Sequence, residues 1–156
     1  MLNVLKFIHL LSIVVWVGAL IFFTFFVAPS IFRVLPKDMA GALVGSIFPK
    51  YWAIGYISGI LSLSTLIAIS FIEKGFPAAR LFLLTVMTVV TFYTGLVVAA
   101  KARELKAQAK VVEDPVKKES IEKEFKKIHF KSSALNMLVL LTGLGLVYVT
   151  GRNIRL

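Results

Sequence analysis

The first part of the chain carries the feature that most limits its fold: no Asp, Glu, Lys or Arg occurs between Lys6 and Arg33. A transmembrane α-helix needs about 20 consecutive apolar residues to cross a bilayer core. A secretory signal peptide has a shorter apolar region, of about 7–15 residues, and a more basic start. We therefore expect a retained first membrane span over about residues 5–28, with Pro29 weakening or ending the helix.

The composition of the chain also indicates a membrane protein. Of its 156 residues, 58% are hydrophobic, which is more apolar surface than a soluble domain of this length can bury. There are no cysteines, which excludes disulfides, thiolate metal sites and cysteine nucleophiles. The net charge of +10 comes from cations between the apolar stretches. We attribute it to membrane topology and to anionic lipid headgroups, and we expect no nucleic-acid partner.

Three further apolar stretches complete the predicted architecture, and we expect them to form spans at about residues 52–72, 78–100 and 132–150. With the first span they make residues 1–156 a single membrane domain, an all-α, up-down four-helix bundle. Tyr51 and Trp52 stand at the start of the second span. They are expected at the headgroup level, where amphipathic rings are common.

The segment between the first two spans has helical periodicity of its own. Met39, Leu43 and Ile47 fall at helical spacing, and prolines stand on both sides of them. This pattern predicts a short interfacial helix over about residues 36–48, which Pro49 limits at its far end.

A charged segment separates the last two spans. It begins with strong helix formers, and Asp114 followed by Pro115 is typical of a helix N-cap and first helical position. We therefore expect a helical hairpin over about residues 101–131 that protrudes from the membrane, with its charges forming a solvated face.

Small and polar residues recur within the spans at helical spacing. Gly41 and Gly45, like Gly55 and Gly59, stand four residues apart, as in helix-packing motifs. Such pairs could pack spans within one subunit or join two, so a homo-oligomer or a larger membrane complex stays open. A row of threonines is expected to face other helices: Thr85, Thr88, Thr91 and Thr94.

The distribution of cations predicts an orientation. One side of an up-down bundle carries five of the 18 Lys and Arg residues, and the side with the hairpin carries the other 13. The positive-inside rule then places the hairpin in the cytoplasm, against anionic headgroups, and both termini outside. The membrane would be a plasma membrane, or the inner membrane of a bacterium. The five cations of the outer side are Lys6, Lys74, Arg80, Arg152 and Arg155.

The two histidines are the first candidates for chemistry. His9 lies inside the first span, where an ionisable group is costly enough to suggest a function. The alternative is a neutral imidazole bonded to a neighbouring helix or to interfacial water. His129 stands among lysines at the entrance to the last span, where we expect it to be solvated. Because a core of about 30 Å separates the two histidines, we expect no shared metal or haem iron.

A second candidate is a row of polar residues in the last span. His129, Ser133 and Asn136 share one helix face, which we expect to look into the bundle, since polar groups avoid lipid. The row could be a structural clamp to the first span around Pro29, or it could line a small-molecule site. Hydrolytic chemistry finds little support, because every acidic residue lies outside the spans.

Three blocks of the sequence carry a family resemblance, and they lie at Phe7–Phe32, Ala40–Trp52 and Phe125–Leu146. They resemble the transmembrane protein 205-like family, also catalogued as domain of unknown function 4149. The resemblance implies a four-span membrane protein and no defined reaction.

The first span has a more distant resemblance. His9, Trp16 and Gly18, in HLLSIVVWVGAL, are similar to the first helix of the copper-resistance D and HemJ-type protoporphyrinogen oxidase families. In the latter, that histidine is associated with haem. This resemblance implies a haem site at His9, with Trp16 and Gly18 beside it.

Two main functions therefore remain. The first is a non-enzymatic membrane protein that acts by binding, as a scaffold, an accessory subunit or a small-solute binding and transport bundle. The alternative is a haem-binding redox protein that uses His9. A third reading is a metal-handling protein that uses His9 or His129. The residues do not decide whether the protein is an enzyme, and they name no cofactor.

Overall fold

A computed structural model describes residues 1–152, and every element in this range is helical. Four helices are long and apolar enough to cross a membrane, which confirms the predicted all-α four-helix bundle. The two longest have 37 residues each and measure about 55 Å, well beyond a bilayer core of about 30 Å. The four are Leu2–Val34, Lys37–Glu73, Ala78–Val111 and Pro115–Gly151. Arg155, one of the cations counted for topology, lies outside the described residues.

The first helix continues past Pro29, where the sequence predicted that the helix weakens or ends. It consists of α1 (Leu2–Phe22), the π-helical segment η1 (Phe23–Val27) and α2 (Ala28–Val34). In η1 the Ala28 N–H donates to the Phe23 carbonyl five residues earlier. A π turn is wider than an α turn, and it stands directly before the proline, whose ring needs room and which has no N–H to donate.

The predicted separate interfacial helix is wrong, because residues 37–73 form one helix, α3 (Lys37–Glu73), with Pro49 inside it. Aromatic packing on both sides of the proline supports the continuous helix. The Phe48 ring stacks on Trp52 with centroids 6.1 Å apart, and Tyr51 lies 4.8 Å from Phe23 of η1. Prolines are tolerated in membrane helices where neighbouring helices hold the chain in this way.

The predicted helical hairpin is present. The third helix consists of α4 (Ala78–Tyr93), a second π-helical segment η2 (Thr94–Val98) and α5 (Ala99–Val111), and α6 (Pro115–Gly151) follows. Asp114 caps α6 as predicted, because its side chain accepts a hydrogen bond from the Val116 N–H at 2.9 Å. Leu105 of α5 is fully buried and α5 packs against α6, so the two arms of the hairpin support each other.

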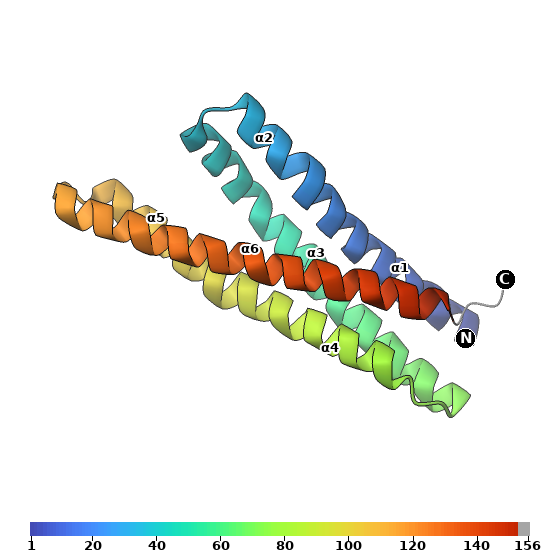
Figure 1. Ribbon diagram of the computed structural model, residues 1–156. Coiled ribbons are helices and arrows are strands. Elements are labelled where there is room, and N and C mark those ends of the chain that lie inside the picture. The colour runs from blue at the N-terminus through green and yellow to red at the C-terminus, as the bar shows by residue number, and fades with distance from the viewer. Residues whose placement is uncertain (153–156) are drawn as a thin grey trace.

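The helices form two antiparallel pairs (Figure 1). The continuous helix formed by α1, η1 and α2 lies against α3. The continuous helix formed by α4, η2 and α5 lies against α6, and contacts between α3 and α4 join the two pairs. The start of α1, the α3–α4 turn and the end of α6 lie at one end of the bundle, which we call the terminal end. The pairs separate toward the other end, which carries the α5–α6 tip and which we call the hairpin end (Figure 1).

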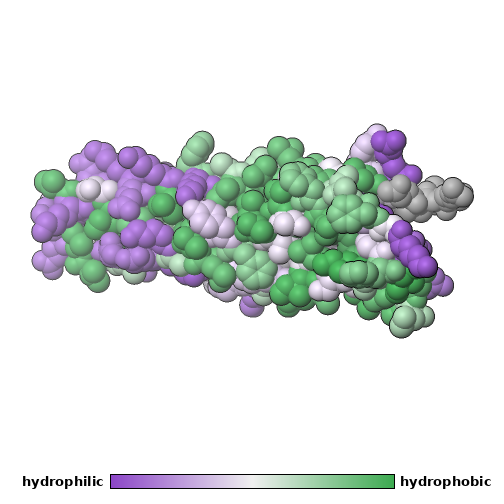
Figure 2. Space-filling view, turned by 90° about the horizontal axis from the view of Figure 1, so that it is seen from below, coloured by the Kyte–Doolittle hydropathy of each residue, from purple (hydrophilic) through white to green (hydrophobic). Residues whose placement is uncertain are grey.

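The surface matches an environment of lipid. Figure 2 shows hydrophilic residues gathered at the hairpin end, a smaller number at the opposite end and a broad hydrophobic zone between them. Large apolar side chains remain exposed along the spans, among them Phe22, Phe71 and Phe82. Since a soluble monomer rarely exposes so much contiguous apolar surface, the protein is an integral membrane protein.

Candidate functional site: a polar centre in the bundle

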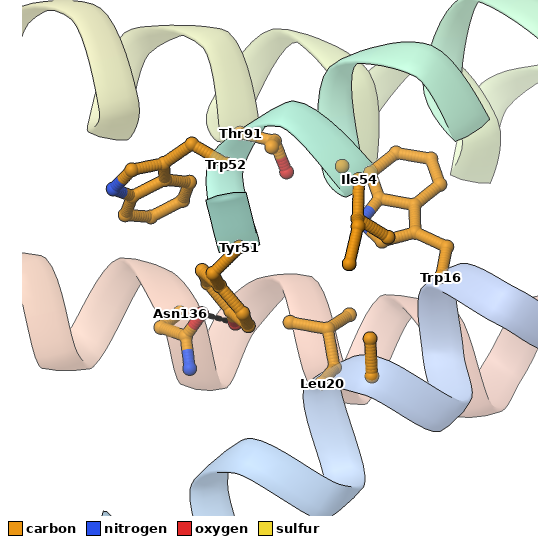
Figure 3. A pocket seen from close by; sticks show the side chains of 9 residues that line it. Trp16, Leu20, Tyr51, Trp52, Ile54, Thr91 and Asn136 are labelled. Atoms are coloured by element: carbon orange, nitrogen blue, oxygen red, sulfur yellow. Dashed lines mark hydrogen bonds between the residues drawn. The ribbon is translucent and has the colours of Figure 1, made fainter. Parts of the chain in front are cut away.

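Asn136 of α6 lies at the centre of a hydrogen-bonded chain across the bundle. Its Oδ1 accepts a hydrogen bond from the Tyr51 hydroxyl of α3 at 2.6 Å, and its Nδ2 donates to Thr24 Oγ1 of η1 at 3.2 Å. Figure 3 shows the bond between Tyr51 and Asn136. We call this chain the Asn136 bridge. It ties three helices together, which is the geometry of a clamp to the first span, one of the two alternatives for this residue.

A small cavity adjoins the bridge, and we call it the central cavity. Its volume is about 10 Å³, enough for about one water molecule. Side chains from α1, α3, α4 and α6 surround it: Trp16, Ala19, Leu20, Tyr51, Trp52, Ile54, Gly55, Thr91 and Asn136. A clamp and a small-molecule site are the two alternatives for Asn136, and in the structure the Asn136 bridge lies beside a cavity.

Thr91 differs from the other threonines of its row. Thr85, Thr88 and Thr94 each donate a hydrogen bond to the carbonyl four residues earlier. The Thr91 hydroxyl is buried, and among residues 1–152 it has no hydrogen-bond partner. In Figure 3 its oxygen points into the space between Tyr51 and Ile54. Trp52 also lines the central cavity, and its buried indole N–H likewise has no partner among the described residues. Two lining residues therefore carry a polar group whose hydrogen-bonding capacity the described chain leaves unused.

The glycine pair of α3 brings the helices together at this level. A Cβ added to Gly55 would lie 2.8 Å from the Thr91 methyl carbon and 3.3 Å from the Trp16 ring nitrogen. A Cβ at Gly59 would lie 3.1 Å from the Thr88 hydroxyl. These glycines therefore pack the spans of one subunit, which decides between the two alternatives for this pair.

Tyr51 and Trp52 lie inside the bundle and not on its lipid-facing surface, where rings at the headgroup level were expected to be. They are 8% and 6% exposed, and Tyr51 points toward Asn136 (Figure 3). The reason is the cluster of rings around Phe23, which makes the bundle interior a better environment than the interface.

The structure divides the predicted polar row of α6. Asn136 faces the bundle, whereas His129 and Ser133 are exposed. The Ser133 hydroxyl donates to the carbonyl of His129 in its own helix, and the imidazole of His129 stacks on Phe125. The inward orientation predicted for the row is therefore wrong for these two, whereas the exposure of His129 agrees with the solvated position expected for it. The two helix pairs separate toward the hairpin end, so the face that meets α3 at Asn136 meets no helix there.

His9 is buried and bound to α3. Its Nδ1 lies 3.0 Å from the Ser62 carbonyl and 3.2 Å from Thr65 Oγ1. Because a carbonyl can only accept, this geometry assigns the hydrogen to Nδ1. In the neutral imidazole Nε2 then carries a lone pair, and within the described part of the chain it has no partner. The bond to a neighbouring helix matches the structural alternative given for His9.

The residues that resemble a haem helix do not all share one face. Trp16 is buried on the same face as His9, where it packs against Gly55 and Gly59. Gly18 is exposed, and no atom of the described residues outside its own helix lies within 4 Å of a Cβ built there. The structure therefore brings Trp16, but not Gly18, into the interior with His9.

The two histidines lie at different levels of the bundle. Thr24 lies opposite Asn136 and Val17 opposite Gly143, and this antiparallel register puts His9 near the level of Gly151. His129 is then about 33 Å farther along α6, at about 1.5 Å per residue. One metal cannot bind both. Across residues 1–152 there is also no group of three or more His, Cys, Asp or Glu that could hold a metal ion.

Comparison with known proteins places the chain in a family. An uncharacterized protein of Aquifex aeolicus (strain VF5) is 46% identical over 48 residues, which are 31% of this chain and 35% of that protein. The match thus spans about a third of that relative, and no solved structure matches. The family model described as a domain of unknown function (DUF4149) matches residues 11–111. Since this range is more than half of the chain, the protein belongs to the DUF4149 family.

Proposed function

We propose that the protein binds a small neutral polar solute in the central cavity and lets such a solute cross the membrane. The observation that carries this proposal is the Thr91 hydroxyl, which is 3% exposed and has no partner among the described residues. Leaving a buried polar group unpaired costs about 1–3 kcal/mol. A molecule that offers a hydrogen bond at this point therefore gains affinity.

The size and chemistry of the cavity define the class of solute. Its volume of about 10 Å³ admits one molecule about as large as water or ammonia. Hydroxyl, amide and indole groups border it, and none of the lining residues is charged. Without a countercharge in the cavity, a neutral solute is favoured over an ion.

The two π-helical segments support passage rather than binding alone. Thr24, one end of the Asn136 bridge, belongs to η1. Gly95 belongs to η2, where Trp52 and the Tyr56 hydroxyl pack against the glycine. Single π turns in α-helices occur frequently at functional sites. Neither segment lines the central cavity, but a change of register in η1 would move Thr24 against Asn136, and one in η2 would move Gly95 against Trp52, and Asn136 and Trp52 do line it.

Stopped-flow measurements on proteoliposomes test the proposal with water, ammonia, urea and glycerol as probes. We expect the protein to raise the permeability of at least one of the two smallest probes, and Thr91→Val to reduce that gain several-fold without lowering stability. Thr88→Val is the matched control, because that hydroxyl bonds within its own helix. Permeabilities equal to those of empty liposomes, or equal losses in both variants, would refute the proposal.

The second candidate is haem binding at His9. The observation in its favour is the Nε2 lone pair, with Nδ1 held by the Ser62 carbonyl. Iron-ligating histidines commonly donate their other N–H to a carbonyl in this way. The resemblance of the first helix to HemJ-type proteins supports the same reading. His9 would hold the haem iron through Nε2, and His129 is too far away to be a second ligand.

Absorption spectra of the purified protein distinguish the two candidates. Haem at His9 predicts a Soret band that is lost in His9→Ala and kept in His129→Ala. A colourless, pure and folded protein contradicts the second candidate and leaves the first untouched. Metal analysis of the same sample tests the third reading, a metal bound through either histidine.

We also propose that the hairpin end is cytoplasmic and meets anionic headgroups, since it carries 13 of the 18 Lys and Arg residues. Because the chain has no cysteine, Lys118→Cys and Lys74→Cys each provide one labelling site. In intact cells an impermeant thiol reagent should modify only the Lys74→Cys protein. The opposite pattern would reverse the orientation.

Two further proposals concern the family resemblance and the oligomeric state. The resemblance to the transmembrane protein 205-like family includes Phe125–Leu146, a block beyond the matched residues 11–111. It supports a four-span protein and no particular reaction. A homo-oligomer or a larger complex would use glycines other than Gly55 and Gly59, whose faces are already filled within the subunit.

A further inference from the structure

The terminal end of the bundle has a second, larger pocket. It has a volume of about 190 Å³ and is formed where α3 turns into α4. It shares no lining residue with the central cavity. We call it the Arg80 pocket. Its main contributors are Leu66, Ile69, Glu73, Phe76, Pro77 and Arg80.

The charges around this pocket do not cancel. The Glu73 carboxylate pairs with Lys6 Nζ of α1 at 2.5 Å, so its charge is already compensated. Arg80 is half-buried on the first turn of α4, and within residues 1–152 it forms no ion pair or hydrogen bond through its side chain. A half-buried guanidinium without a partner favours an anion.

The floor and rim of the pocket are apolar. Leu66 and Ile69 are 1% and 6% exposed and form the floor. The Phe76 ring on the rim is largely exposed. The Ser70 hydroxyl, also in the lining, already donates to the Leu66 carbonyl at 2.7 Å. A ligand that fills this space therefore needs an acidic group at one end and an apolar portion at the other.

The position of the pocket agrees with such a ligand. The α3–α4 turn joins two membrane-spanning helices, so it lies where the hydrocarbon core gives way to headgroups. We propose that the Arg80 pocket binds an anionic amphiphile, with its phosphate or carboxylate on Arg80 and the first methylenes of its chain over Leu66 and Ile69. The volume admits a headgroup and a short part of the chain.

Binding of defined lipids to the full-length protein in detergent tests this assignment. Native mass spectrometry would compare phosphatidylglycerol, phosphatidylcholine and free glycerol phosphate. We expect phosphatidylglycerol to bind best and its affinity to fall about tenfold in Arg80→Gln. Arg152→Gln is the matched control, since this exposed arginine at the same end lies over the Tyr148 ring and outside the pocket. Its affinity should stay within about twofold of the wild type.

Three results would overturn the proposal: equal affinities in Arg80→Gln and the wild type, equal losses in both arginine variants, or free glycerol phosphate binding as tightly as the lipid. The last result would replace the amphiphile with a soluble anion. Arg80→Lys keeps the charge and should keep part of the affinity if Arg80→Gln proves unstable. Transport through the central cavity can fail without affecting these outcomes.

Discussion

Asn136 and His9 are both buried polar residues in apolar helices, yet they hold the bundle together in different ways. Asn136 bonds side chains of two other helices, Tyr51 on α3 and Thr24 in η1. His9 bonds α3 alone, through the Ser62 carbonyl and the Thr65 hydroxyl. The Asn136 bridge therefore joins both helix pairs, whereas the contacts of His9 stay within one pair.

The two residues also differ in the hydrogen-bonding groups that they leave without a partner. Asn136 uses both ends of its amide, and its partners have no further hydrogen bond among the described side chains. His9 uses one nitrogen, and its partners are bonded elsewhere, since Thr65 also donates to Leu61. A group whose partners depend on it is a structural connection. A group with an unused lone pair is available to a ligand.

Replacing Asn136 should give the largest loss of stability. Asn136→Leu leaves the Tyr51 and Thr24 hydroxyls unpaired in the interior, at about 1–3 kcal/mol for each buried group, so we expect a loss of about 3 kcal/mol. Unfolding in mixed micelles of SDS and dodecyl maltoside measures it. Adding Tyr51→Phe should cost less than the sum of the single effects. Full additivity would mean that the bond of Tyr51 contributes nothing.

The packing beside the Asn136 bridge should be nearly as sensitive. In Gly55→Ala the new methyl group would lie 2.8 Å from a Thr91 carbon, and overpacking of this kind costs about 1–3 kcal/mol. We expect a loss of about 2 kcal/mol in the same unfolding assay. Gly45→Ala is the control, because no described atom beyond its own helix lies within 4 Å of that Cβ. It should be neutral or stabilising, since alanine favours helix. Equal effects would argue against the close crossing at Gly55.

The overall fold was predictable from the sequence because long apolar stretches in a membrane have few alternatives to helices. The two errors in the fold concern prolines, whose effect depends on how the residues around them pack. Pro49 looked like a helix end, but the rings of Phe48 and Trp52 pack across it. Pro29 looked like the end of the first span, but the π turn of η1 precedes it. The residues directly before both prolines are apolar, and apolar residues are common in lipid-facing and in packed helices, so they do not reveal these compensations.

His9 was predictable as a candidate because it is an ionisable residue in an apolar span, and Asn136 because it shares a helix face with other polar residues. Tyr51 was assigned to the headgroup level because a ring at the start of a span looks the same whether it faces lipid or another helix. Thr24 is the one hydroxyl between Trp16 and Pro29, which was a usable signal. Among the described threonines of the row, Thr91 lacks a hydrogen-bond partner, and its methyl group packs against Gly55 of α3. The residues around Thr91 in the sequence give no indication of this contact.

Replacing His9 should lower the stability less than Asn136→Leu or Gly55→Ala. His9→Leu removes the bonds of Nδ1, while the Thr65 hydroxyl keeps its bond to the Leu61 carbonyl and the side-chain volume is similar. Buried hydrogen bonds between membrane helices contribute about 0.6 kcal/mol on average, so we expect a loss of about 1 kcal/mol or less. Unfolding of the cofactor-free protein measures it. A loss equal to that of Asn136→Leu would erase the distinction between the two residues.

A surface charge of the hairpin should matter least. Lys123 pairs with Glu119 at 2.8 Å, but both side chains are 68% exposed, and exposed pairs at this helical spacing contribute about 0.3–0.5 kcal/mol. Lys123→Ala also places a strong helix former in α6, so we expect a change below about 0.5 kcal/mol in the same assay, and less in high salt. If this variant lost as much stability as Asn136→Leu, the inward position of Asn136 could no longer explain its effect. The stability of the bundle would then depend on the hairpin rather than on its polar centre.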